Sequence, residues 1–403
     1  MGAILPLLLS GGAALLAAFG VDKDIARLWF PVASVVGAVI SLLLFLSAQI
    51  QSSTAAGSLG ARFKKGVIQW RYPFLWAVAL VSITYMAVGP EVRVLTDEST
   101  LLSTALAIYQ SGKAQLISIG LYFNDQFLPV GLQIPLRPVL YPLLVAMLHM
   151  LTGYRLANGF VVSFFGMVVG LTSVIGLARS VGRPMLGYLA AALLMGFPLI
   201  ALTATSCGLE ALNLGLVLLT FYFLAIYIEA PSWHRFESVL YASILAAQCR
   251  YETALLIAIV SVAGLINFRL LMTSRLPYRL LIAPWLIIPL VWQRLLSSSI
   301  NGGDQVESAF GLDYLWTNLH HAAEFFTPTW PSIYPVSGTV VLFGLVGIVA
   351  TLLSSQALDP DNRSKLHTYL SLVAAYIGGT LVIHCLYYVG DLREPQLMRI
   401  GVI

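Results

Sequence analysis

The stretch PFLWAVALVSITYMAVGPEVRVLTDESTLLSTALAIYQSGK, residues 73–113, decides the fold. It opens with an apolar run that ends at Gly89-Pro90, which is typical of a membrane-spanning helix. Two adjacent carboxylates, Asp97 and Glu98, follow directly at the expected membrane edge. Two acids at the membrane edge of a mostly hydrophobic chain indicate either helix capping or catalysis on a substrate that emerges from the bilayer.

From Glu98 to Gly112 the apolar residues recur at helical spacing. This pattern predicts an amphipathic helix lying on the membrane surface. We expect Thr96 or Asp97 to cap its start, with Glu98 in the first turn, where the helix dipole favours an anion. Glu98 is therefore the more structural acid, and Asp97 is the candidate catalytic base.

The composition requires a membrane environment for most of the chain. Of 403 residues, 59% are hydrophobic and 10% are charged, with a mean hydropathy of +0.87, whereas a soluble domain carries roughly 25% charged residues. Backbone groups inside a bilayer must be paired within helices, and the apolar runs lack the alternation of a membrane barrel. We predict an all-α, polytopic transmembrane bundle of about 11–13 membrane segments, with no nucleic-acid partner.

Basic residues set the orientation. The loop 50–72 and the Arg269–Arg279 loop should lie in the cytoplasm, which places the loops 90–137 and 301–336 outside. We therefore expect a multi-pass protein of the inner or plasma membrane with an extracytoplasmic site. The first run, Met1–Gly20, lacks a basic start and a cleavage site, so it is interpreted as a retained helix.

The segment 138–204 does not fit this scheme, because two crossings would put the basic turn Arg179–Arg183 outside. Either one of its helices is re-entrant, or 185–204 does not cross. Gly196 and Pro198 fit a broken helix there.

Three regions are expected in the chain. These are additional N-terminal helices and a basic loop (1–72), a membrane core with the external loop 90–137 (73–270), and C-terminal helices with the external loop 301–336 (271–403). The last residues, Arg399-Ile-Gly-Val-Ile, resemble the start of another apolar helix, as in a truncated chain.

Four further charged residues are candidates for a site. Arg137 lies at the lip of a proline-rich segment, where an arginine either snorkels to the interface or binds phosphate. Glu210 opens an apolar run, as a capping acid or as a functional group within the membrane. Arg250, in Arg250-Tyr251-Glu252, either forms a local ion pair or faces an anionic headgroup, and Arg393 is a weaker candidate. His320 and His321 are unsuited to one metal site, because adjacent residues point to different faces of a helix.

These motifs together resemble the GT-C superfamily of polytopic glycosyltransferases, in particular its protein O-mannosyltransferase-like and aminoarabinose transferase-like branches. The resemblance covers roughly residues 73–270. It rests on an acidic pair after an early span, an amphipathic helix that ends in glycine, the proline-rich start of the next helix, an acid that opens a later helix, and the Arg250-Tyr-Glu252 motif.

The resemblance implies that Asp97 is the catalytic acid of the first external loop, with Glu98 beside it and Glu210 as the second acid. Family members commonly have aspartate where this chain has Glu210. The resemblance also implies a sugar donor on a polyprenyl or dolichyl phosphate, an acceptor that is a glycan, lipid or protein, and inversion at the anomeric carbon.

Simple chemistry agrees with these roles. A phosphate leaving group needs cations, for which Arg137, Arg250 and Arg393 are candidates, and the acceptor hydroxyl needs a base, for which Asp97 is the candidate. Asp97 and Glu210 could hold a divalent metal, although nothing in the sequence requires one or any other cofactor. The alternatives are an O-antigen polymerase or ligase and a non-enzymatic lipid or sugar transporter.

Overall fold

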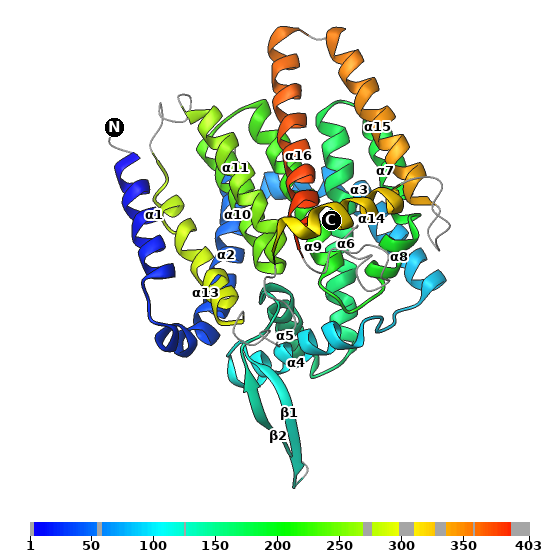
Figure 1. Ribbon diagram of the computed structural model, residues 1–403. Helices are drawn as coiled ribbons and strands as arrows, with labels where there is room; N and C mark the ends of the chain where they lie inside the picture. The colour runs from blue at the N-terminus through cyan, green and yellow to red at the C-terminus, as the bar shows by residue number, and fades with distance from the viewer. Residues whose placement is uncertain are drawn as a thin grey trace.

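The structure is a computed structural model that describes residues 4–54, 59–124, 126–268, 276–297, 310–326, 336–357 and 359–387. Figure 1 shows a bundle of roughly parallel and antiparallel helices with a hairpin projecting from one end. The elements are, in chain order, α1 (Ile4–Phe19), α2 (Lys23–Thr54), α3 (Leu59–Val88), α4 (Leu95–Ser111), β1 (Leu116–Phe123), β2 (Gln126–Gln133), α5 (Leu140–Thr152), α6 (Ala157–Ser180), α7 (Pro184–Met195), α8 (Pro198–Ala204), α9 (Glu210–Glu229), α10 (Trp233–Cys249), η1 (Tyr251–Ala254), α11 (Leu255–Ile266), η2 (Tyr278–Leu281), η3 (Ala283–Ile287), α13 (Ile288–Ser297), η4 (Leu312–Tyr314), α14 (Leu315–Phe326), α15 (Val336–Ser354), η5 (Ser355–Ala357) and α16 (Pro360–Cys385).

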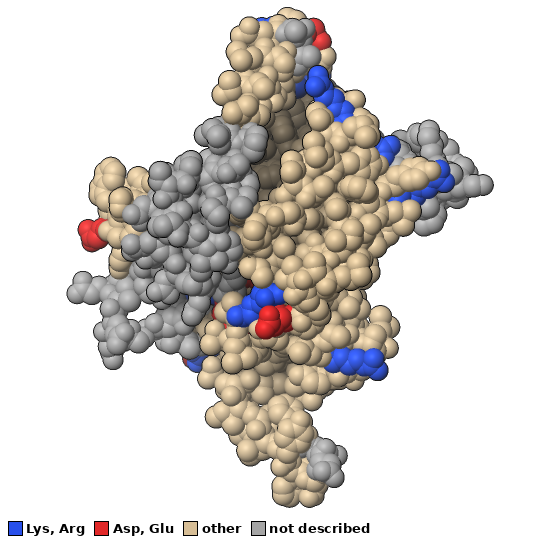
Figure 2. Space-filling model, turned by 90° about the vertical axis from the view of Figure 1, so that its right-hand side faces the viewer, with Lys and Arg blue, Asp and Glu red and all other residues tan. Residues whose placement is uncertain are grey.

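The predicted all-α polytopic architecture is confirmed. Within the described ranges, six helical segments are long and apolar enough to cross a membrane, or seven if one bent pair counts as a span. Shorter apolar helices add to these and account for part of the difference from the expected 11–13 segments. Figure 2 shows a face on which a broad uncharged area lies between the charged side chains near its upper end and those lower down, as lipid contact requires. The six segments are Lys23–Gln51, Trp70–Val88, Ala157–Ser180, Glu210–Glu229, Tyr278–Leu296 and Pro360–Cys385.

The short helix α5 resolves the topology of the segment 138–204. It has 13 residues and is about 20 Å long, which is less than the roughly 30 Å of a bilayer core. It packs against α4, and α6 begins at the same end, where the Tyr141 hydroxyl donates to the Gly159 carbonyl at 3.0 Å. Helix α5 is therefore the segment that does not cross alone, and α6 makes the crossing.

The basic turn after α6 consequently lies at the end of the bundle opposite α4. The Arg179 guanidinium sits 5.6 Å from the centroid of the Trp70 ring, at the start of the apolar part of α3. Trp70 lies within the basic stretch 50–72, which from Leu59 onward is part of α3 and not the expected loop. Both basic stretches therefore share one end, as the positive-inside rule requires.

The broken helix predicted over 185–204 is confirmed. Helices α7 and α8 are bent by 80° across Gly196 and Phe197, and Pro198 starts α8. The break brings the chain back to the α4 end, where the Glu91 amide donates to the Thr205 carbonyl at 3.1 Å.

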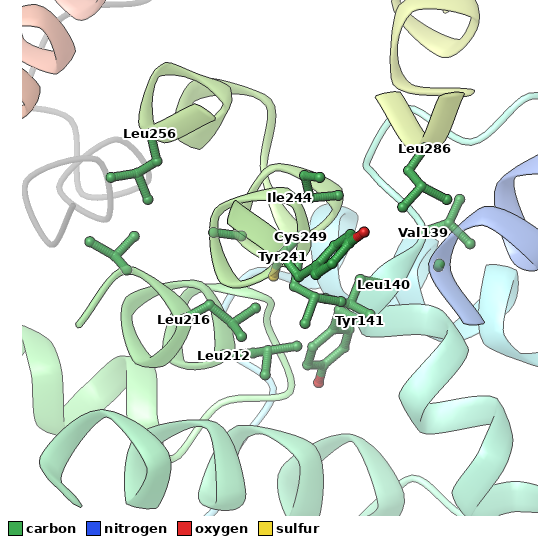
Figure 3. Close-up of a cluster of buried hydrophobic side chains, with 14 of the residues drawn as sticks. Val139, Leu140, Tyr141, Leu212, Leu216, Tyr241, Ile244, Cys249, Leu256 and Leu286 are labelled. Carbon is green, nitrogen blue, oxygen red and sulfur yellow. The ribbon is translucent and has the colours of Figure 1, made fainter. Parts of the chain in front are cut away.

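The main core lies where α5, α9, α10 and α11 meet (Figure 3). Tyr141 of α5 and Tyr241 of α10 are both 0% exposed and lie among the leucines of α9. Both hydroxyls have acceptors, Gly159 O for Tyr141 and Arg279 O for Tyr241, so these large rings are buried without unpaired polar atoms.

Helices α6 and α9 make the most extensive helix pair, and glycines set their separation. A Cβ on Gly166 would lie 2.6 Å from the Leu212 Cα, and a Cβ on Gly215 would overlap the Gly166 carbonyl oxygen. Small residues permit this close backbone approach, which stabilises helix pairs in lipid.

We expect Gly215→Ala to destabilise the protein by about 1–3 kcal/mol, because the added methyl group meets rigid backbone rather than a movable side chain. The matched control is Gly347→Ala in α15, where a Cβ meets nothing within 4 Å. Thermal unfolding in detergent would measure both; a Gly215→Ala protein as stable as the control would contradict the close-packing interpretation.

The loop 90–137 contains one predicted element and one unpredicted element. The amphipathic helix is present as α4, and Gly112 ends it in the left-handed conformation with φ of 69°. The following segment forms an antiparallel hairpin of β1 and β2, which the sequence did not predict. Its apolar side chains are exposed on both faces, including Leu121 at 56% and Tyr122 at 80%, so it lacks the alternation that marks a half-buried strand.

Candidate active site

Asp97 and Arg137 form an ion pair at the α4 end of the bundle. The Arg137 Nη2 donates to the Asp97 Oδ2 at 3.0 Å, and both side chains are partly exposed. Asp97 lies in the first turn of α4, and Arg137 lies between β2 and α5, so the hairpin brings together two residues that are 40 positions apart.

Gln293 of α13 fixes the segment that carries Arg137. Its Nε2 donates to the carbonyls of Pro135 and Arg137 at 2.8 and 2.7 Å. Burial opposes the Arg137 charge, yet the charges of Asp97, Glu252 and Glu210 raise the pKa of Arg137 above its ordinary value. Arg137 is therefore a firmly cationic group among three carboxylates.

Glu98 is 1% exposed and has a structural role. Its Oε1 accepts the backbone N–H groups of Arg93 and Val94, and its Oε2 accepts the amide and thiol of Cys207 at 3.3 and 2.9 Å. The expected capping by Thr96 or Asp97 does not occur, since α4 begins at Leu95 and Glu98 reaches back instead. Burial and the hydrogen bond to Glu98 raise the pKa of the Cys207 thiol, which keeps it a donor.

We expect Glu98→Gln to lower the free energy of unfolding by about 1–3 kcal/mol, because an amide cannot accept all four hydrogen bonds and leaves buried donors unpaired. Glu91→Gln is the control, since the Glu91 side chain is 70% exposed. Equal thermal stability of the two variants would exclude the structural role of Glu98.

Arg250 and Glu252 form a second ion pair, in the turn between α10 and α11. The Arg250 Nε donates to the Glu252 Oε2 at 3.1 Å, and Arg250 is 8% exposed. Although burial opposes the Glu252 charge, Arg250, a backbone hydrogen bond and Arg137 lower the pKa of Glu252 to about 2. Thr253 holds the turn by donating to the Ala246 carbonyl at 2.6 Å.

Glu210 begins α9 and is 7% exposed. Its carboxylate lies against Gly208, where any Cβ would overlap its Oε2. The N-terminus of α9 favours a negative charge at this place. Glu210 also acts electrostatically on Arg137, so it belongs to the same charged neighbourhood as Asp97.

The structure thus brings most of the predicted site residues to one end of the bundle. Asp97 and Arg137 are in contact, and Arg137 lies within electrostatic range of Glu210 and Glu252. Arg393 lies outside the described residues. In the described part of the chain, no three His, Cys, Asp or Glu side chains form a group that could hold a metal ion.

Two features near the site had no signal in the sequence. Cys207 binds Glu98 from a turn 109 residues away, and a contact at that distance leaves no local pattern. Tyr376, Thr380 and His384 of α16 are separated by apolar residues, so they do not stand out in the sequence. Their spacing of four residues nevertheless places them on one face of the helix.

Fold and site together define a multi-pass membrane protein with a partly buried, charged centre at one end of its helix bundle. No family model matches the sequence, and no curated protein matches it. Among solved structures, the chain is similar to ArnT from Cupriavidus metallidurans, crystallised with undecaprenyl phosphate. The TM-score is 0.47 at 14% identity, and the match covers 81% of this chain and 58% of that one, so this chain spans less than two thirds of its length.

Proposed function

We propose that this protein is a membrane glycosyltransferase that moves a sugar from a polyprenyl-phosphate donor to an acceptor hydroxyl. The observation that carries the proposal is the convergence of two arginine–carboxylate pairs, Asp97–Arg137 and Arg250–Glu252, with the buried acid Glu210 close by. A site with fixed cations beside a carboxylate suits the displacement of a phosphate by a hydroxyl.

In the proposed reaction, the acceptor oxygen attacks the anomeric carbon of the donor sugar. The bond from that carbon to the phosphate oxygen breaks, and its electron pair leaves on the polyprenyl phosphate. Asp97 takes the proton of the acceptor hydroxyl, while Arg137 and Arg250 offset the charge of the departing phosphate. Attack opposite the leaving group inverts the anomeric configuration.

The remaining acids have supporting roles in this proposal. Glu252 orients Arg250 through their contact at 3.1 Å. Glu210 adds negative potential near Arg137, and Glu98 fixes the start of α4 that presents Asp97. The site faces the extracytoplasmic side, because it lies at the end opposite the basic residues Arg179 and Arg183.

The proposal is tested with the full chain in proteoliposomes and with radiolabelled undecaprenyl-phosphate glucose, mannose and galactose. Crude lipid, glycan and protein fractions serve as acceptors. We expect one labelled sugar to become covalently attached to an acceptor fraction, and NMR of the product to show the inverted configuration. Exchange of label across the membrane without a covalent product would overturn the proposal and indicate a transporter.

A further inference from the structure

One face of α16 carries three polar side chains, Tyr376, Thr380 and His384, here called the polar stripe. They recur at every fourth residue and therefore lie on one side of the helix. All three are buried, at 1%, 7% and 7% exposure, whereas Ile377 and Val382 on other faces are 56% and 51% exposed. An apolar helix that turns its polar side chains inward in this way marks a functional surface.

Among the described residues, the side-chain polar atoms of this stripe have no hydrogen-bond partner outside the stripe itself. Tyr376 Oη, Thr380 Oγ1 and His384 Nε2 are each buried and meet no partner in good hydrogen-bond geometry, although the Tyr376 and Thr380 side chains lie close enough to interact with each other. The His384 Nδ1 lies 2.7 Å from the Thr380 carbonyl, so it is the protonated nitrogen and a neutral ring presents Nε2 as an acceptor. Buried polar groups are normally well paired, so three on one face that reach no partner outside the stripe need an explanation.

The stripe lies next to the Arg250–Glu252 pair. Both Tyr376 and His384 interact electrostatically with Arg250 and Glu252. Helix α16 contacts η1 and α11, and its Gly379 permits the close approach, since a Cβ there would lie 2.7 Å from Leu255.

Helix α14 fixes the end of α16 that bears His384 (Figure 1). The Asn318 amide donates to the carbonyls of Cys385 and Tyr387 at 3.1 and 2.8 Å. At the other end of the stripe, the Tyr376 ring packs edge-on against Phe221 of α9 at 5.5 Å. Asn318 thus fixes the His384 end of the polar stripe, and Phe221 packs against its Tyr376 end.

The chemistry of the stripe selects its ligand. Two hydroxyls can donate and accept, and one imidazole nitrogen accepts, so the set matches a ligand with several hydroxyl groups. It carries no fixed charge for a phosphate, and one histidine with two hydroxyls is not a transition-metal site. The neighbouring Arg250 supplies the cation that a phosphate needs.

We infer that the polar stripe binds the hydroxyl groups of the sugar in a lipid-linked donor whose phosphate lies at Arg250. This inference rests on the proposed function and adds a subsite to it. Each hydrogen bond between the stripe and the sugar should contribute a 3- to 10-fold change in Kd.

The experiment compares two ligands by thermal shift on the full chain in detergent. One is bare undecaprenyl phosphate, and the other is undecaprenyl phosphate carrying glucose, mannose or galactose. We expect at least one glycosylated lipid to stabilise the wild-type protein more than the bare lipid does. Tyr376→Phe and Thr380→Val should each weaken binding of that glycosylated lipid about 3- to 10-fold and leave binding of the bare lipid unchanged.

Two controls separate binding from structure. Tyr241→Phe removes a buried hydroxyl that does have a partner, Arg279 O at 2.8 Å, so it should lower the melting temperature without changing the preference between ligands. Tyr376→Phe should lower the melting temperature of the ligand-free protein less than Tyr241→Phe does, because its hydroxyl has no well-formed hydrogen bond and only the Thr380 side chain nearby. A lowered melting temperature with an intact ligand preference would overturn the inference.

The double variant Arg250→Gln/Glu252→Gln tests the phosphate end without leaving one buried charge unpaired. It should weaken binding of both ligands. If the wild-type protein binds bare and glycosylated lipids equally, the polar stripe does not bind sugar, although the proposed function can stand. If it binds neither lipid, the proposed function itself fails.

Discussion

Asp97→Asn should reduce sugar transfer by about 10²- to 10⁴-fold, the usual contribution of a general base. The amide has the same size and still accepts a hydrogen bond from Arg137, but it cannot take a proton and no longer carries the charge that pairs with Arg137. The Kd of the donor should change little. Stability should also change by no more than about 1 kcal/mol, because the ion pair is partly exposed, with 28% of the Asp97 and 40% of the Arg137 side chain accessible.

The control for this variant is Asp361→Asn in α16. Asp361 also pairs with a cation, Lys365 at 2.6 Å, but it is exposed and lies at the start of α16, far along the helix from His384. Initial rates of label transfer in proteoliposomes would compare the two. Full activity of Asp97→Asn would mean that another group takes the proton.

Arg250→Met should lower the free energy of unfolding by about 2–3 kcal/mol at neutral pH. Glu252 would lose its partner in a largely buried place, and an unpaired buried charge is costly. This loss is smaller than is usual for a broken buried pair, because 25% of the Glu252 side chain remains accessible to solvent. The double variant Arg250→Met/Glu252→Leu should recover most of the stability, because no charge remains unpaired.

The pH dependence gives a second measure of this pair. In the wild-type protein the pKa of Glu252 is about 2, below its ordinary 4.5, so the pair contributes stability above pH 4.5 that is lost as the pH falls toward 2. Without Arg250, the largest cause that lowers the pKa of Glu252 is gone while burial still raises it, so this pKa should move up and the deficit of the variant should shrink as the pH falls through the higher value. Melting temperatures measured at neutral pH and near pH 4.5 would show this; a deficit that is the same at both would contradict it.

The elements whose signals lie within a few neighbouring residues were predicted correctly from the sequence. The apolar spacing after Glu98 and the glycine at 112 correctly gave α4, and Gly196 with Pro198 correctly gave the bend between α7 and α8. The sequence placed the start of α4 too late, because neither Thr96 nor Asp97 caps it and the Glu98 side chain instead binds the amides of Arg93 and Val94 just before Leu95.

Other features depend on partners that are distant in the sequence. The hairpin β1–β2 is apolar on both faces, so no alternation identifies it. The role of α5 depends on where α6 begins, which only the contact from Tyr141 to Gly159 reveals. For the site, the acids and arginines could be nominated from their positions at helix ends, but the pairing of Asp97 with Arg137 requires the fold.

The carboxylate of Glu98 connects two distant parts of the chain through hydrogen bonds. Its Oε1 accepts from the amides of Arg93 and Val94, just before α4, and its Oε2 accepts from Cys207, three residues before Glu210. The distance between Asp97 and Glu210 therefore depends on the few residues that Glu98 connects. It does not depend on the forty positions between Asp97 and Arg137. The length and shape of the β1–β2 hairpin can consequently change without changing the distance between Asp97 and Glu210.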